Sequence, residues 1–421
     1  MRPLSTTDGR SVEVINPGQH NHDAGPDFFN AKVKIDGQVW VGNVEIHQRS
    51  SDWFRHHHDN DAAYDNVILH VVGLADVPVP LPHNPDQFIP QLQLDVPLQV
   101  MQNYDTLLRS DALPRCRDVV STLNKLTLHS WLSALQVERL EQRMEQVLQR
   151  LTACGNDWER TFFITVARNF GFGINGDAFE AWANTLQPSA IGKHRDDLFQ
   201  IEAIFFGQAG LLDTAPDPTP DYFLRLQQEY RFMQRKFSLT PINPSRWRFL
   251  RLRPQNFPHI RIAQLAALYC QQRLNFSRML EVRDVAQLSE LFSASVSTFW
   301  QTHYNFSAEE TTHHTGQLSK SSLDLLCINT VVPVLFAYGR YKSNEVLQEQ
   351  ALALLDQLKP ERNAIVEAWE QAGVHAESAA DTQALIHLTR NYCEPHDCLR
   401  CRFGYEFIRR NPDFLREEEE G

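Results

Sequence analysis

The segment spanning residues 29–47 constrains the fold most, because its pattern is that of a β-hairpin. Apolar and polar residues alternate over residues 29–35, and Asp36-Gly37 is a strong signal for a two-residue turn. A second run over residues 39–47 supplies the partner strand. The chain is therefore predicted to begin with a small β-sheet.

Three side chains with metal-ligand chemistry lie at the ends of this predicted hairpin. Side chains on a strand repeat every two residues, so Glu45 and His47 share one face. Asp27 comes where the first strand begins and is expected opposite them. Two carboxylates and an imidazole predict a site for Mg²⁺ or Mn²⁺ bound by Asp27 and Glu45, which would activate water at a scissile phosphate. His47 would orient that water, act as a base, or bind a softer metal.

The flanking segments extend the predicted order to β-β-β-α-β. Residues 11–15 form a strand, residues 53–64 a short helix and residues 67–72 a buried strand. This order resembles the core of the PD-(D/E)XK nuclease superfamily, and the resemblance implies that Asp27 and Glu45 are its two acids. His47 stands where that superfamily usually has lysine. The superfamily core also begins with a helix, which is either missing upstream of this chain or supplied from elsewhere.

Longer motifs along the chain resemble an uncharacterised bacterial family, a domain of unknown function of the DUF2851 type. The resemblance is carried by residues 21–28 (NHDAGPDF), 51–56 (SDWFRH), 64–70 (YDNVILH), 207–210 (GQAG), 253–258 (RPQNFP), 328–330 (INT) and 393–401. This family has no established activity. The resemblance therefore indicates which proteins this chain is related to, but it does not imply a reaction.

Length and periodicity predict an α+β protein of two parts. The 421 residues suggest two or three domains. Residues 1–120 are predicted as the α/β unit, with a Pro-rich, irregular extension from residue 77, and residues 121–421 as an all-α domain. About ten amphipathic segments, beginning near residue 126, support the second part.

The composition limits the cellular location and the partners that are expected for this chain. No apolar run reaches the roughly 20 residues that span a bilayer, and the N-terminus has no apolar signal region, so no membrane is expected. Seven cysteines without a disulfide pattern indicate a reducing cytoplasm. The formal charge of −12 argues against general affinity for nucleic acid, although a local basic groove is compatible with it.

A second metal site is predicted at Cys393, Cys398 and Cys401. Three thiols within nine residues of a cytoplasmic chain suit Zn²⁺ or an iron–sulfur cluster. The sequence leaves the fourth ligand open among His387, His396, Cys116 and Cys327. The alternative is three reduced cysteines that pack a C-terminal turn.

A basic and aromatic stretch is the candidate nucleic-acid surface. Between residues 225 and 261 lie nine Lys or Arg residues and one acid, with aromatic residues between them. Such a surface could bind phosphates and stack bases. The residues predicted to bind DNA or RNA are Arg246, Arg248, Arg251, Arg253 and Arg261. The alternative is that these arginines pair with the excess acids.

These features together predict metal-dependent phosphodiester hydrolysis on DNA or RNA. One rival is a non-catalytic protein that binds nucleic acid or a partner and keeps a degenerate nuclease-like core. Another is a metal-dependent hydrolase of a small substrate, which the acidic charge favours. Convergence of Asp27, Glu45 and His47 would weaken the non-catalytic rival, and burial of Glu45 against an arginine would strengthen it.

Overall fold

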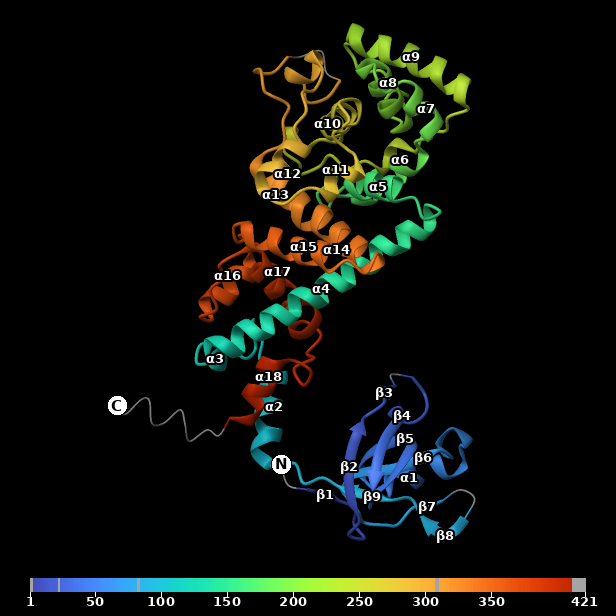
Figure 1. Ribbon diagram of the computed structural model, residues 1–421, viewed down its shortest axis with the longest axis vertical. Coiled ribbons are helices and arrows are strands. Elements are labelled where there is room, and N and C mark those ends of the chain that lie inside the picture. The colour runs from blue at the N-terminus through green and yellow to red at the C-terminus, as the bar shows by residue number, and fades with distance from the viewer. Residues whose placement is uncertain (1–2, 22, 82–83, 307–309, 411–421) are drawn as a thin grey trace, which may run out of the picture. The chain divides into compact units, whose positions relative to one another are not determined.

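The chain folds into two compact units, each described here by itself. The computed structural model describes residues 3–21, 23–81, 84–306 and 310–410. One unit comprises Met1–Ser110 and Glu406–Gly421, and the other comprises Asp111–Tyr405. Strands occur in the first unit and most helices in the second (Figure 1). The predicted α+β class is confirmed, although the residues from Glu406 onward belong with the first unit.

The first unit is built on a mixed sheet of seven strands. Its strands are β1 (Leu4–Ser5), β2 (Ser11–Asn16), β3 (Gln19–His20), β4 (Phe28–Ile35), β5 (Gln38–Arg49), β6 (Val67–Leu74) and β9 (Gln91–Gln93). The order is β1-β2-β4-β5-β6-β9, with β3 beside β4. Strands β2, β4 and β5 are antiparallel neighbours, whereas β6 runs parallel to β5 and β9 parallel to β6. A separate pair consists of β7 (Pro80–Leu81) and β8 (Asn84–Phe88).

The predicted hairpin is present as β4 and β5. Asp36 and Gly37 have φ values of 50° and 84°, the left-handed conformation that a tight two-residue hairpin turn requires. The predicted helix over residues 53–64 is wrong. A short helix α1 (Asp52–Arg55) is followed by two 3₁₀ turns, His58–Asn60 and Ala62–Tyr64. His57 lies between them with φ of 61°, which a continuous helix does not allow.

The two faces of β5 have different chemistry, as the period of two predicts. Val44 belongs to an apolar cluster that includes Val33 of β4 and Leu69 of β6. Glu45 and His47 alternate with it and are also buried. One face of the sheet is therefore an apolar core, and the other carries buried polar groups.

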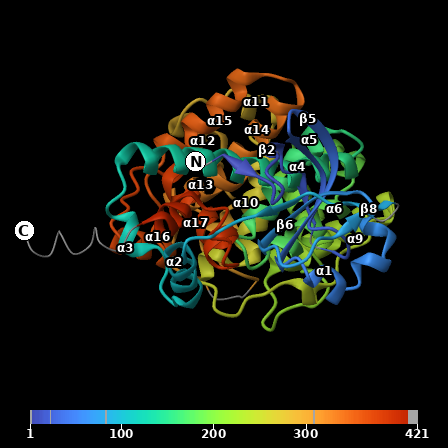
Figure 2. The ribbon, with the colours of Figure 1, turned by 90° about the horizontal axis from the view of Figure 1, so that it is seen from below.

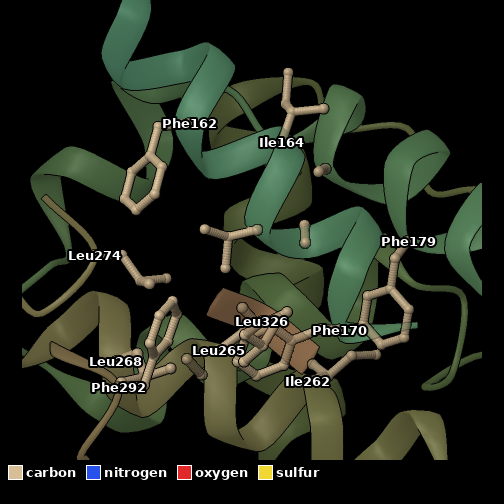
Figure 3. Close-up of a cluster of buried hydrophobic side chains, with 14 of the residues drawn as sticks. Phe162, Ile164, Phe170, Phe179, Ile262, Leu265, Leu268, Leu274, Phe292 and Leu326 are labelled. Carbon is tan, nitrogen blue, oxygen red and sulfur yellow. The ribbon is translucent and has the colours of Figure 1, made fainter. Parts of the chain in front are cut away.

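The second unit is helical and has one large core. Its helices are α3 (Arg117–Val120), α4 (Lys125–Ala153), α5 (Trp158–Phe170), α6 (Gly176–Thr185), α7 (Pro188–Lys193), α8 (Leu198–Gln208), α9 (Asp221–Phe237), α10 (Pro258–Cys270), α11 (Phe276–Leu280), α12 (Val285–Leu291), α13 (Lys320–Leu326), α14 (Val332–Tyr341), α15 (Glu345–Gln357), α16 (Ala364–Gln371) and α17 (Ala379–Leu388). The long helix α4 packs against α14 and α17, and α14 packs against α15 (Figure 2). Figure 3 shows part of this core, a buried cluster to which Phe162 and Phe170 of α5 and Leu265 and Leu268 of α10 all belong.

Two further helices, α2 and α18, complete the fold. Helix α2 (Leu98–Arg109) lies in the first unit, within the stretch that was predicted to be irregular. Helix α18 (Arg402–Arg409) continues the chain from the second unit into the first. Asn103 of α2 bonds to α18, because its Nδ2 group donates to the carbonyl oxygens of Ile408 (3.0 Å) and Arg410 (2.9 Å).

One helical stretch, Lys320–Tyr341, is long and apolar enough to cross a bilayer, contrary to the expectation that no such run exists. It consists of α13, a π-helical turn (Cys327–Val331) and α14. Within its apolar window, 72% of the residues are buried inside the structure. Because a core helix of a globular unit passes the same test, this stretch is weak support for a membrane span.

Candidate metal centre

Glu45 and His47 of β5 meet on the polar face of the sheet. Glu45 Oε1 lies 3.4 Å from His47 Nε2. Asp27 is joined to them through backbone bonds. The Asp27 N–H donates to Glu45 Oε2 (3.1 Å), and the Ile46 N–H donates to Asp27 Oδ2 (2.8 Å). The structure thus brings together the three residues that the sequence singles out, with Asp27 fixing the position of the Glu45 carboxylate.

Two further histidines, from the segment after α1, complete the cluster. His56 Nδ1 lies 3.2 Å from His47 Nε2, and His58 Nε2 lies 3.4 Å from Glu45 Oε1. The ligand atoms of His47, His56 and His58 all lie within 4.8 Å of one another. The density of histidines in the first 70 residues hinted at such a site, but their spacing did not show which of them converge.

The distances within this cluster suit a bound transition metal. Ligands at about 2.0–2.1 Å from a tetrahedral Zn²⁺ are about 3.4 Å apart, and the ligand atoms of His47 and His56 are 3.2 Å apart. The three histidines lie within 4.8 Å of one another, and Glu45 Oε1 lies 3.4 Å from both His47 and His58. Imidazole nitrogens suit Zn²⁺, Fe²⁺ or Ni²⁺, whereas Mg²⁺ prefers oxygen ligands and water. The donor set therefore favours a softer metal than the Mg²⁺ or Mn²⁺ expected at Asp27 and Glu45.

A second layer of side chains holds the histidines in place. His47 Nδ1 lies 2.8 Å from Nε2 of His70, which sits on β6. The Tyr64 ring stacks on His58 with the ring centroids 3.7 Å apart. Trp53 presents its ring edge-on to His47, His58 and His70. Partners that fix the ring orientation are typical of histidines that bind metals.

Burial sets the charge of these groups. Burial lowers the pKa of His47 to about 4, and His58 and His56 add to this effect. Burial and His47 likewise lower the pKa of His70 to about 4. Burial raises the pKa of Glu45 to about 7, with a further contribution from Asp27. His47 is therefore neutral at pH 7, which is the form that binds a metal.

The cluster is open on one side. His47 is buried, His58 is half-buried and His56 is exposed. Structural zinc sites are usually closed, whereas catalytic sites keep a position for water or substrate. This gradient of exposure is the one expected of a reactive centre.

The predicted cysteine site is only partly assembled. Cys116, Cys393, Cys398 and Cys401 are all buried. Arg115 Nε donates to the Cys393 carbonyl oxygen (3.4 Å), so the chain next to Cys116 lies near the other three in space although it is distant from them in sequence. Burial raises the pKa of Cys116 and of Cys393, and neighbouring thiols add to both shifts. No three of these four thiols lie within 4.8 Å of one another. A metal at Cys393, Cys398 and Cys401 stays a prediction.

Four of the five arginines predicted to bind DNA or RNA lie on the surface, and their binding stays a prediction. Arg246, Arg248, Arg251 and Arg253 are exposed, and none forms an ion pair with the residues that the structure describes. Arg261 is an exception, because only 4% of its surface is exposed and it bonds to Gln264 and Asn256. Charge density in the sequence could not show that α10 turns this arginine inward.

The family described as "Protein of unknown function (DUF2851)" matches residues 1–364. The chain belongs to the DUF2851 family. No curated protein and no solved structure matches it, and the comparisons give no match to PD-(D/E)XK nucleases. The matched range of this DUF2851 protein includes the whole metal centre, whereas Cys393, Cys398 and Cys401 lie beyond it. Its function must therefore be inferred from the geometry of the centre.

Proposed function

We propose that this DUF2851 protein is a metal-dependent hydrolase that cleaves the phosphodiester bonds of DNA or RNA. One observation carries the proposal: the ligand atoms of His47, His56 and His58 lie within 4.8 Å of one another, His56 is exposed, and Glu45 Oε1 lies 3.4 Å from His47 and from His58. In this proposal the three histidines hold the metal.

Glu45 and Asp27 have separate roles in this proposal. A bound metal lowers the pKa of a coordinated water and polarises a phosphoryl oxygen. Glu45, a buried carboxylate 3.4 Å from His47 and from His58, accepts a proton from that water. Asp27 positions Glu45, because the Asp27 N–H donates to Glu45 Oε2 while Glu45 Oε1 points toward the histidines. His70 positions His47 through the 2.8 Å contact between their rings.

The phosphodiester substrate is proposed from the arrangement of the sheet. Strands β2, β4 and β5 form an antiparallel run, and β6 returns parallel to β5 after α1. This is the β-β-β-α-β order on which the resemblance to PD-(D/E)XK nucleases rests, with Asp27 beside β4 and Glu45 on β5. His56 and His58, together with histidine in place of lysine at His47, mark a metal centre of different composition.

The non-catalytic rival loses support at Glu45. The contacts of its carboxylate within the described residues are the Asp27 N–H, His47 and His58, and none is an arginine. A carboxylate held in this way keeps an oxygen available to a metal. A hydrolase that acts on a small substrate would have the same site geometry. Assays with different substrates distinguish it from a nuclease.

Cleavage assays with metal-loaded protein test the proposal. The full-length protein is loaded with Zn²⁺, Mn²⁺ or Mg²⁺ and given single- and double-stranded DNA, RNA and the small diester bis(p-nitrophenyl) phosphate. We expect Glu45→Gln and His58→Ala to abolish cleavage, and His57→Asn, which tolerates the left-handed backbone there, to retain it. Cleavage of the small diester alone would favour the small-substrate hydrolase. No cleavage with any metal would overturn the assignment.

A further inference from the structure

The helical unit contains a cavity of about 440 Å³ that plays no part in the metal centre. Its wall includes Arg139 and Arg143 of α4, and also Asn329, Arg390 and Asn391. Asn329 belongs to the π-helical turn Cys327–Val331, and the other two to a second π-helical turn, Thr389–Cys393. Because π-helical turns occur frequently at functional sites, two of them on one cavity indicate a binding site.

Arg139 is a buried charge without a counter-ion at contact distance. Only 6% of its surface is exposed, and its Nη1 atom has no hydrogen-bond partner. Among the residues that the structure describes, Arg139 forms no ion pair within 4.0 Å. The pKa of this guanidinium is lowered to about 10. Burial is the main cause, Arg143 and Arg390 add to the lowering, and Glu361 opposes it. A buried, unpaired cation is strongly unfavourable unless an anion joins it.

The rest of the wall provides hydrogen-bond donors and little negative charge. Glu361 is the one carboxylate of the described lining, and Gln383 already donates to it. Helix α16 begins at the cavity with Ala364 and Ile365, so its positive end adds to the field of the arginines. The wall therefore has an excess of positive charge.

We propose that this cavity binds a small phosphate-bearing ligand, with Arg139, Arg143 and Arg390 as its phosphate ligands. The planar guanidinium group donates paired hydrogen bonds that match phosphate oxygens. The volume lies within the range of small-molecule sites.

The surroundings favour a small ligand over nucleic acid. A neighbouring groove shares Gln142, His387 and Asn391 with the cavity wall. That groove is lined with acids, namely Glu138, Glu141, Glu145 and Asp397. An extended polyanion would meet this negative surface as soon as it left the cavity, whereas a ligand confined to the cavity would not.

The proposal is tested by titrating the full-length protein with inorganic phosphate and with pyrophosphate. Calorimetry measures the binding, and thermal unfolding measures the melting temperature. Potassium chloride at matched ionic strength controls for a general salt effect. We expect saturable binding, and affinity at least about ten-fold weaker in Arg139→Met and Arg390→Gln. Lys342→Gln removes an exposed positive charge elsewhere and should bind like the wild type. His58→Ala should also bind like the wild type, which separates this site from phosphate at the metal centre.

Arg139→Met gives a second readout, because replacing an unpaired buried charge by an apolar side chain of similar length should leave the ligand-free protein at least as stable. Phosphate should then no longer raise its melting temperature. No saturable binding of either probe to the wild type would overturn the proposal. Equal binding by Arg390→Gln and the wild type would also overturn it.

Discussion

Glu202 is a buried carboxyl whose charge state links stability to pH. It lies on α8 and is fully buried, and the Tyr222 hydroxyl donates a hydrogen bond to it. Burial raises its pKa from 4.5 to about 7. The folded state therefore binds this proton more tightly than the unfolded state does. Its contribution to stability is complete below about pH 4.5 and is lost as the pH rises through about 7.

We therefore expect Glu202→Gln to remove part of the pH dependence of unfolding. A shift of this size corresponds to about 3 kcal/mol between pH 4.5 and pH 8. Urea unfolding at pH 5 and pH 8 measures the difference, and the variant should lose less stability than the wild type over that interval. An equal loss in both proteins would show that Glu202 is not the titrating group.

At the candidate metal centre, the sequence reveals the candidate ligands that lie on a strand and misses those on the irregular segment. The period of two places Glu45 and His47 on one face without any structural information. In a helix, residues 56 and 58 would lie about 200° apart around the axis. The left-handed backbone at His57 brings both side chains into one cluster instead. That conformation has no pattern in the sequence, so the sequence could not predict the complete ligand set.

At the level of elements, the apolar periodicity of the sequence predicts a helix correctly where the helix buries a wide apolar face. The apolar spacing of residues 158–170 predicts a helix, and α5 has these bounds and buries seven of its residues. Helix α2 was missed, because Leu107 is its one buried residue and Pro-rich sequence precedes it. The apolar spacing of residues 285–299 also predicts a helix, but α12 ends at Leu291 and Thr298–Gln301 forms a 3₁₀ turn. Short and exposed helices depend on tertiary contacts that periodicity does not report.

One such contact joins α2 to the end of α18. Asn103 Nδ2 donates to the carbonyl oxygens of Ile408 and Arg410, which have no intrahelical partner at a helix C-terminus. We expect Asn103→Ala to lower the free energy of unfolding by about 1 kcal/mol. Gln102→Ala, at the exposed neighbouring position, is the matched control. Urea unfolding monitored by circular dichroism measures both, and equal stability of the two variants would contradict the role of Asn103.

At the scale of the whole molecule, the net charge is negative whereas one stretch of the surface is locally positive. The chain carries a formal charge of −12, so binding of nucleic acid must come from a local basic surface. Arg246, Arg248, Arg251 and Arg253 are exposed without ion pairs in the described chain, and they are the residues predicted to provide such a surface. The sequence predicted this patch from its density of arginines. It could not predict that Arg261 faces inward, because the orientation of α10 depends on the core.

We expect the double variant Arg248→Glu/Arg253→Glu to weaken DNA or RNA binding several-fold or more. Each lost phosphate contact should also flatten the logarithmic salt dependence by about one. Lys359→Glu changes charge at an exposed position outside the patch and is the control. Fluorescence anisotropy at several salt concentrations measures both quantities. Unchanged salt dependence in the double variant would exclude this surface as the binding face.

X-ray absorption at the edge of the bound metal in the full-length protein tests the metal centre most directly. Nitrogen and oxygen ligands lie at about 2.0–2.1 Å from zinc and sulfur ligands at about 2.3 Å, so the two predicted sites give separate shells. We predict an imidazole-rich nitrogen and oxygen shell in the wild type and in His57→Asn, and its loss in His58→Ala. A sulfur shell alone in the wild type, or an unchanged nitrogen and oxygen shell in His58→Ala, would contradict the proposed centre.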